Sequence, residues 1–162
     1  MPMYLDIPNI PGESQSPNAN WNNKIEIQHW TYDVSLDHSM EAGTGVVASG
    51  ARVGYMHITK SMDKATPLLF AQLCLGQTIP NMYLRVTQPG PSGPYEAETY
   101  QMQWVVVSHY STSGSPGMGS LPQESWQLAF IAMTETYQDV KDGAMQPAVT
   151  NGFDFGTGVV TK

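Results

Sequence analysis

The feature that most constrains the fold is one short helix pattern, at residues 66–75, in a chain whose other patterned segments alternate as β-strands do. Thr66 can cap a helix N-terminus. Pro67 suits the first helical position, because the N–H that proline lacks would have no partner within the helix there. Gly76 is a typical helix stop. The apolar residues between them are Leu68, Leu69, Phe70, Leu73 and Leu75. We expect Leu69, Leu73 and one of Phe70 and Leu68 to be buried.

The composition excludes several classes of protein. Fourteen acidic residues against seven basic ones give a net charge of -7. Nucleic-acid binding needs clustered Lys and Arg, so we expect no nucleic-acid partner. The single cysteine, Cys74, precludes an intrachain disulfide, and its place among apolar residues predicts a buried thiol. No apolar run reaches the roughly 18 residues of a membrane span, which predicts no membrane insertion.

The N-terminal residues alternate and carry Asp6 and Pro8 in place of an apolar leader. We therefore expect no secretory signal peptide, and synthesis and folding in the cytosol.

The strand covering residues 24–36 has the most informative alternation. Its apolar positions are odd-numbered up to Ile27 and even-numbered from Trp30, so the apolar phase changes near Gln28 and His29. A β-bulge, or a strand that passes from one core to another, would explain this change. On either interpretation His29, Thr31, Asp33 and Ser35 lie on a polar side opposite Trp30, Tyr32 and Val34.

The remaining segments predict a mainly β fold. Residues 38–50 are small and Gly-rich and predict a long protruding loop or hairpin, and residues 89–94 predict a turn. A long strand over 95–110 has Tyr100, Met102, Trp104 and Val106 on one side. Seven or eight strands and one helix predict a small antiparallel β-barrel or sandwich with a flanking α-helix at about 66–75. No linker interrupts the chain, so we expect a single domain over 1–162.

Several motifs are similar to those of one family. Residues 10–14 are IPGES, residues 24–32 are KIEIQHWTY, residues 58–67 are ITKSMDKATP, and residues 152–154 are GFD. They resemble the patterns I-x-G-E-S, I-E/D-V-x-x-W-S-W, F-T-K-x-x-D-K-S-S-P and G-W-D/N of the haemolysin-coregulated protein (Hcp) family. Glu124, Trp126 and the apolar positions after them resemble its late strand. Tyr32 and Phe153 stand where that family usually has Trp.

The resemblance implies a structural role. Hcp proteins are tube subunits of the bacterial type VI secretion system: six copies form a ring, rings stack into a tube, and a contractile sheath expels the tube behind a spike protein. Effectors travel inside the rings. For this chain the resemblance implies a homo-hexamer with these partners, secreted to the extracellular space or a target cell without a signal peptide.

Catalytic, metal and cofactor roles have little support in the sequence. The four histidines, His29, His38, His57 and His109, are far apart and lack the spacing of a ligand set. We therefore expect no catalytic residue, no metal, no cofactor and no enzyme activity. Two alternatives remain: a ligand-binding or enzymatic β-barrel with an aromatic pocket near Trp30, Tyr32 and Trp104, and a phage-type tail tube protein.

Two sets of residues are candidates for tube function. In the ring that the resemblance implies, an outward polar sheet face near the six-fold axis lines the hole, which predicts that His29, Thr31, Asp33 and Ser35 face the lumen and its cargo. The alternative is that these four residues lie on a solvated outer face. The Gly-rich segment 38–50 predicts an arm that packs on a neighbouring subunit or ring through Thr44, Val46, Val47 and Ser49.

Overall fold

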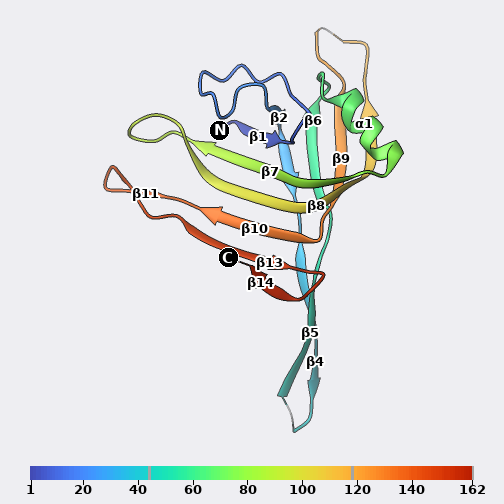
Figure 1. The fold of residues 1–162 in the computed structure, drawn as a ribbon, viewed down its shortest axis with the longest axis vertical. Coiled ribbons are helices and arrows are strands. Elements are labelled where there is room, and N and C mark those ends of the chain that lie inside the picture. The colour runs from blue at the N-terminus through green and yellow to red at the C-terminus, as the bar shows by residue number, and fades with distance from the viewer. Residues whose placement is uncertain (44, 118, 162) are drawn as a thin grey trace.

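The computed structural model describes residues 1–43, 45–117 and 119–161, which form one helix and a set of antiparallel strands (Figure 1). The helix is α1 (Thr66–Leu75). The strands are β1 (Met3–Asp6), β2 (Ile25–Ile27), β3 (His29–Thr31), β4 (Val34–Glu41), β5 (Gly45–Val53), β6 (Met56–Ser61), β7 (Thr78–Gln88), β8 (Tyr95–Ser113), β9 (Gln123–Ala129), β10 (Ala132–Tyr137), β11 (Val140–Lys141), β12 (Ala144–Met145), β13 (Val149–Asp154) and β14 (Val159–Thr161).

The strands form one branched sheet that curls around the core. Along its main path the order is β14-β13-β10-β8-β7-β1-β2, and β9 joins the other half of β8 and carries β6 and then β3. Figure 1 shows β7, β8, β10 and β13 crossing the view while β6 and β9 stand steeply against them. The predicted mainly β fold with one helix is confirmed. Among the described residues no strand pair closes the sheet into a barrel: one end of the path is β2, which pairs with β1, and the branch ends at β3, which pairs with β6.

The change of pairing partner between β2 and β3 explains the change of apolar phase in the sequence. Ile25 and Ile27 are buried beside β1, and Gln28 follows between the two strands. The backbone N–H of Gln28 donates to the carbonyl of Thr59, at 2.8 Å, so the chain joins β6 at this point. One continuous segment therefore pairs with β1 through β2 and with β6 through β3.

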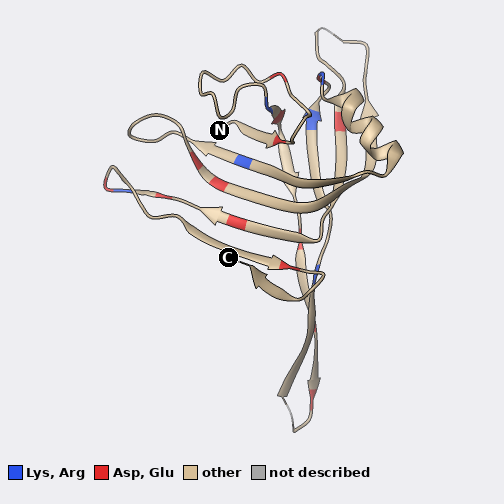
Figure 2. Cartoon of the chain, in the orientation of Figure 1, with Lys and Arg blue, Asp and Glu red and all other residues tan. Residues whose placement is uncertain are grey.

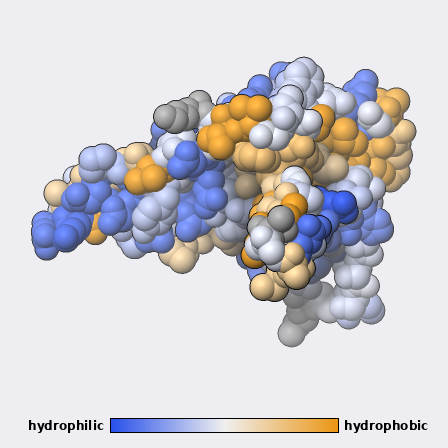
Figure 3. Space-filling model, turned by 90° about the horizontal axis from the view of Figure 1, so that it is seen from below, coloured by the Kyte–Doolittle hydropathy of each residue, from blue (hydrophilic) through white to orange (hydrophobic). Residues whose placement is uncertain are grey.

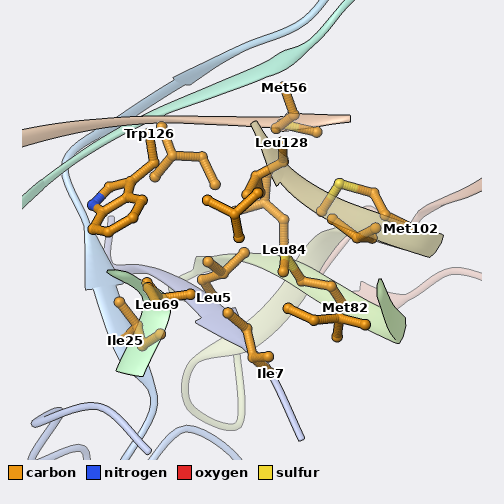
Figure 4. Close-up of a cluster of buried hydrophobic side chains, with 14 of the residues drawn as sticks. Leu5, Ile7, Ile25, Met56, Leu69, Met82, Leu84, Met102, Trp126 and Leu128 are labelled. Carbon is orange, nitrogen blue, oxygen red and sulfur yellow. The ribbon is translucent and has the colours of Figure 1, made fainter. Parts of the chain in front are cut away.

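The core lies inside the curled sheet (Figure 4). Seven of its fully buried members come from five strands: Ile25, Met56, Ile58, Met82, Leu84, Met102 and Leu128. Figure 4 shows Leu5 of β1 and Leu69 of α1 packed beside them. Each such side chain contributes about 1.5–3 kcal/mol by leaving water, so this cluster is the main stabilising element of the fold.

The helix has the predicted bounds but a narrower buried face. Leu69 is 3% exposed and Leu73 packs against the core from a partly buried position. Leu68 and Phe70 are 43% and 49% exposed, so the expectation that one of them is buried is wrong. Cys74 is exposed, which also overturns the predicted buried thiol. The reason is that α1 covers the sheet along one narrow stripe and leaves its other sides to solvent.

The ends of α1 differ in how well the sequence predicted them. Gly76 adopts φ 60° and its N–H donates to the carbonyl of Leu73, which confirms the predicted stop. The N-cap position is Ala65, and the Thr66 hydroxyl does not cap the helix. Instead a carboxylate oxygen of Asp63 accepts the N–H of Ala65 at 3.0 Å. The Thr66 hydroxyl instead forms hydrogen bonds with the buried side chains of Lys60 and Glu124.

Strand β8 changes its side-chain phase at Trp104. Tyr100 and Met102 are buried, but the next buried residues are Val105 and Val107, and Trp104 is 56% exposed with φ 55°. The phase changes because β8 pairs with β10 before this point and with β9 after it. The strict alternation that places Trp104 on the same side as Tyr100 and Met102 therefore breaks at this residue, and the Trp104 ring is left exposed.

The segment predicted as a protruding loop or hairpin is a hairpin. Strands β4 and β5 pair only with each other among the described residues and project away from the curled sheet, at the lower end of Figure 1. The hairpin spans 34–53, so it begins before and ends after the predicted 38–50. We call residues 34–53 the arm.

Candidate functional site

The motif around Lys60 builds a buried cluster of charged side chains. Lys60 and Glu124 are 0% and 1% exposed, on adjacent strands β6 and β9. The Lys60 Nζ lies 2.9 Å from Glu124 Oε2 and 2.7 Å from Asp63 Oδ1, and it donates to the Thr66 hydroxyl at 3.1 Å. Figure 2 shows this pair as a blue segment of β6 beside a red segment of β9.

Every charge in this cluster has several partners. Glu124 also accepts hydrogen bonds from the Thr66 hydroxyl at 2.9 Å, from Trp126 Nε1 at 3.2 Å and from the Tyr110 hydroxyl at 3.2 Å. Burial raises the pKa of Tyr110, so its hydroxyl keeps the proton that it donates. A buried ion pair is tolerated only when its remaining hydrogen-bonding capacity is satisfied, as it is here. The cluster therefore ties the start of α1 to β6 and β9.

The buried ion pair in this motif was not predicted from the sequence, although the alternation of β6 and β9 indicates it. Met56 and Ile58 are inward-facing positions of β6, so the alternation places Lys60 inward as well. The same alternation in β9 places Glu124 on the inward side with Trp126 and Leu128. Two opposite charges at inward positions of separate strands are a signal for a buried pair.

A second motif segment contacts the first. The backbone N–H of Lys64 donates to Glu13 Oε1 at 2.9 Å, which joins the IPGES segment to the residues before α1. Gly12 is required there by close packing, because a Cβ at this position would lie 2.2 Å from the carbonyl oxygen of Lys24. Two of the segments that carry the resemblance, 10–14 and 58–67, are thus in direct contact.

The polar residues predicted to face cargo are exposed, and the structure brings only part of the set together. His29 and Thr31 both lie in β3, Asp33 lies between β3 and β4, and Ser35 lies in the arm opposite Arg52. The carbonyl of Asp33 accepts the N–H of Gly54 at 2.9 Å.

His29 and Thr31 belong to a larger polar surface. Antiparallel pairing sets Thr31 opposite His57, His57 opposite Gln127, and Gln127 opposite His109. The neighbouring row contains His29, Thr59, Ser125 and Ser111. Residues directly opposite each other on paired strands share a face. We call these eight residues the cross-strand polar face.

The arm presents exposed apolar side chains on both strands. Val46 and Val47 are 62% and 47% exposed, and Met40, which pairs with Val46, is 84% exposed. Ser49 is exposed and its hydroxyl donates to the carbonyl of Asp37 at 3.0 Å. Thr44, the fourth residue predicted for the arm contact, lies outside the described residues. Figure 3, which looks from below along the arm, shows apolar side chains interspersed with hydrophilic ones at this end of the protein.

The aromatic residues proposed for a ligand pocket pack against one another. The ring centroids of Trp30 and Tyr32 are 5.9 Å apart, and that of Tyr100 lies 4.8 Å from Trp30. Tyr32 donates to Glu135 at 3.4 Å and Tyr100 donates to Glu98 at 3.2 Å. Burial raises the pKa of both tyrosines, and the neighbouring carboxylates raise it further.

The structure does not bring Trp104 to this group. Within the described part of the chain Trp104 makes no ring contact with Trp30 or Tyr32. A hollow of about 280 Å³ beside Tyr32 is lined mainly by apolar side chains, with Glu135 as its one carboxylate. A catalytic site needs polar groups that converge on one point, which this hollow lacks.

The described residues contain neither a metal-binding cluster nor a membrane-spanning helix. No group of three or more His, Cys, Asp or Glu side chains is placed to hold a metal ion in those parts of the chain. No helix in the described ranges is long and apolar enough to cross a membrane.

Comparisons with known proteins agree on one family. The family described as "Type VI secretion system effector, Hcp" matches residues 4–137. The chain is 31% identical to "Protein hcp1" of Pseudomonas aeruginosa over 143 residues, which cover 88% of this chain and 86% of that protein. It is similar to the crystal structure of Hcp1 from Salmonella typhimurium, with 27% identity, a TM-score of 0.76 and coverage of 96% and 95%.

A solved structure described as a type six secretion system protein has the same fold, with a TM-score of 0.89, 23% identity and coverage of 99% of both chains. The family match spans most of the sequence, including the buried charge cluster and the arm. The chain therefore belongs to the Hcp family of the type VI secretion system.

Proposed function

We propose that this protein is a tube subunit that assembles into hexameric rings, and that the rings stack into the tube expelled by a type VI secretion system. Its membership of the Hcp family carries this proposal. The arm supports it from the structure, because a projecting hairpin with exposed Val46 and Val47 is a surface that a neighbouring copy can cover. The role is structural and has no catalytic step.

Ring closure uses two different patches on each subunit, one for each neighbour. We assign the arm to one of these contacts, or to the contact between stacked rings. Exposed apolar side chains on an isolated hairpin are costly in water, and packing them on a second copy removes that cost.

We assign the polar side of β3, with the residues that follow it, to the surface that lines the lumen of the ring. His29, Thr31, Asp33 and Ser35 are exposed and offer hydrogen bonds to an effector carried inside the ring. In this function the partners are the spike protein at the tip, the contractile sheath around the tube, and the effectors. The subunit is made in the cytosol and leaves it within the expelled tube.

The experiment that tests the proposed function is the mass and shape of the purified protein. Light scattering should give six times the 17.7 kDa of the chain, and electron microscopy should show rings with a central hole. A monomer at all concentrations would contradict the tube role and favour the alternative of a ligand-binding β-barrel. Rings that assemble only in the presence of phage tail components would favour the phage-type tail tube.

A further inference from the structure

A pocket of about 600 Å³ lies where the loop between β1 and β2 meets the turn between β7 and β8, beside the start of β1 (Figure 1). Its surface is mainly apolar, and its volume falls within the range of about 300–1,000 Å³ that is typical of small-molecule sites. No residue assigned above to the arm, to the lumen or to the buried charge cluster lines it. The pocket therefore has no part in the role proposed above.

Two stacked aromatic rings form the apolar side of this pocket. Tyr4 and Trp21 both line it, with their ring centroids 6.0 Å apart and their planes within 7° of parallel. Trp21 Nε1 donates to Glu96 Oε1 at 2.9 Å, and Arg85 Nη1 donates to the other oxygen of that carboxylate at 2.8 Å. The indole is thus held in place without a ligand, which lowers the ordering cost of binding one.

The rim of the pocket is also held by hydrogen bonds. The carbonyl of Pro2 accepts the backbone N–H of Thr87 at 3.1 Å and the Thr87 hydroxyl at 2.8 Å. Four of the lining residues are prolines: Pro2, Pro17, Pro89 and Pro94. Because proline has no N–H, these positions offer a ligand no backbone donor.

The Tyr4 hydroxyl is an unused polar group in this pocket. Tyr4 is 4% exposed, and no hydrogen bond among the described residues involves its hydroxyl. In that part of the chain, the one side-chain nitrogen or oxygen that is sealed from solvent without a partner is Arg85 Nε. The Tyr4 hydroxyl is therefore open to the pocket that it lines. Since a buried tyrosine usually has a hydrogen-bond partner, this hydroxyl is free to take one from outside the protein.

One carboxylate lies next to this hydroxyl. Glu26 of β2 pairs directly with Tyr4 of β1, so their side chains share a face, with Cβ atoms about 4.5–5.5 Å apart. Glu26 is exposed and forms no ion pair with another described residue. It is the one charged side chain of the lining, which contains no Lys, Arg or His. The pocket therefore attracts a cation and repels an anion.

We propose that this pocket is a binding site for a small aromatic amine. The ring of the ligand packs beside Trp21 and Tyr4, and its ammonium group donates hydrogen bonds to the Tyr4 hydroxyl and the Glu26 carboxylate. The proline rim disfavours ligands that need backbone donors, and the carboxylate disfavours anions. The site belongs to a single subunit, so the proposal goes beyond the tube role and does not depend on ring assembly.

The test compares two probes that share one ring system. Tryptamine carries an ammonium group on its indole and indole-3-propionate carries a carboxylate, and calorimetric titration at pH 7.5 measures the binding of both. Tryptamine should bind with a dissociation constant of roughly a millimolar or tighter. Its affinity should exceed that of indole-3-propionate by about fivefold or more. No binding of tryptamine at about 10 mM, or equal affinity for the two probes, would overturn the proposal.

Substitutions then assign the two polar contacts. Glu26→Gln should reduce the preference for tryptamine to less than about twofold. Glu13→Gln is the matched control, because Glu13 borders a neighbouring hollow together with Glu26 but does not line this pocket, and it should leave the preference unchanged. Tyr4→Phe keeps the ring beside Trp21 and should weaken tryptamine binding by about threefold. A full preference in Glu26→Gln, or an unchanged tryptamine affinity in a folded Tyr4→Phe, would contradict the proposal.

A further pair of variants locates the site. Gln15 is an exposed residue of the lining, so Gln15→Trp should fill the pocket and abolish the binding of tryptamine. Gln77→Trp makes the same change at an exposed position just after α1, outside the lining, and should bind as the unmodified protein does. Binding that survives in Gln15→Trp would place the ligand elsewhere and refute the proposal. If Gln15→Trp or Tyr4→Phe has a lowered unfolding temperature, Glu26→Gln, at an exposed position, decides the outcome.

Discussion

At the scale of single residues, the most consequential side chain is Lys60. Its amine serves two carboxylates and a hydroxyl inside the protein, so its removal leaves Glu124 and Asp63 without their compensating charge. Breaking one side of a buried ion pair is far more damaging than never having built the pair, because the remaining charge stays out of water. Stability should therefore be more sensitive to Lys60 than to any exposed lysine.

We predict that Lys60→Met lowers the free energy of unfolding by about 3–5 kcal/mol. The matched control, Lys64→Met, changes an exposed lysine four positions away and should stay within about 0.5 kcal/mol. Urea denaturation followed by tryptophan fluorescence measures both variants. Equal stabilities for the two would mean that the buried pair has no structural role.

The tyrosines beside Trp30, Tyr32 and Tyr100, should make the folded state less stable at alkaline pH. Because burial raises the pKa of Tyr32 and Tyr100 in the folded state, folding favours their neutral forms. Their contribution is complete below the ordinary tyrosine pKa of about 10 and is lost as pH rises above it. We predict that thermal unfolding shifts to lower temperature between pH 9 and pH 11, and that Tyr32→Phe/Tyr100→Phe reduces this shift. A shift of the same size in that variant would assign it to other groups.

At the scale of elements, α1 contributes through one narrow stripe. Leu69 is buried against the sheet, whereas its chain neighbour Leu68 is 43% exposed. The helix also depends on the residues just before it, where Asp63 and Thr66 join the buried charge cluster. Its position is therefore set by one apolar contact and one polar one.

We predict that Leu69→Ala lowers the free energy of unfolding by about 2–5 kcal/mol, because it leaves a cavity under the helix. Leu68→Ala makes the same chemical change on the exposed side and should cost less than about 1 kcal/mol. Leu73→Ala should fall between them, since Leu73 is partly buried. The order of these three values, measured by chemical denaturation, checks the assignment of the buried stripe.

At the scale of the whole molecule, the arm is the feature on which the pairing of the curled sheet does not depend. Strands β4 and β5 pair with each other and project from the rest of the fold. Their removal should therefore change assembly and not folding.

We predict that deletion of residues 44–49 leaves a folded protein that assembles poorly. Circular dichroism and the unfolding temperature should be close to those of the full chain, while light scattering should show fewer rings. The substitution Val46→Ser/Val47→Ser keeps the length of the arm and should weaken assembly in the same direction. Rings of unchanged stability in both variants would remove the arm from the subunit contacts.

The polar side of β3 yields a separate prediction for cargo. Thr31→Gln keeps a polar, uncharged side chain at an exposed position, so rings should form normally while the amount of co-purified effector falls. Collapsed rings would place Thr31 in a subunit contact, and full cargo would place it on another surface.

Much of the local structure could be predicted from the sequence, because it depends on neighbours in the chain. The helix bounds followed from Pro67 and Gly76, and the turn at 89–94 followed from its prolines and glycines. The hairpin around 38–50 and the phase change at Gln28 were also visible as patterns of apolar and small residues. The motifs pointed to the Hcp family, which the comparisons bear out.

Tertiary structure decided what each pattern contacts. Alternation cannot show that β8 changes partner at Trp104 and exposes that ring, or that α1 leaves Phe70 and Cys74 in solvent. The pairing of Lys60 with Glu124, and the gathering of His29, His57 and His109 on one face, depend on the register between strands distant in the sequence. The physical reason is that local propensity acts within a few residues, whereas pairing and burial depend on which strands meet when the whole sheet curls around its core.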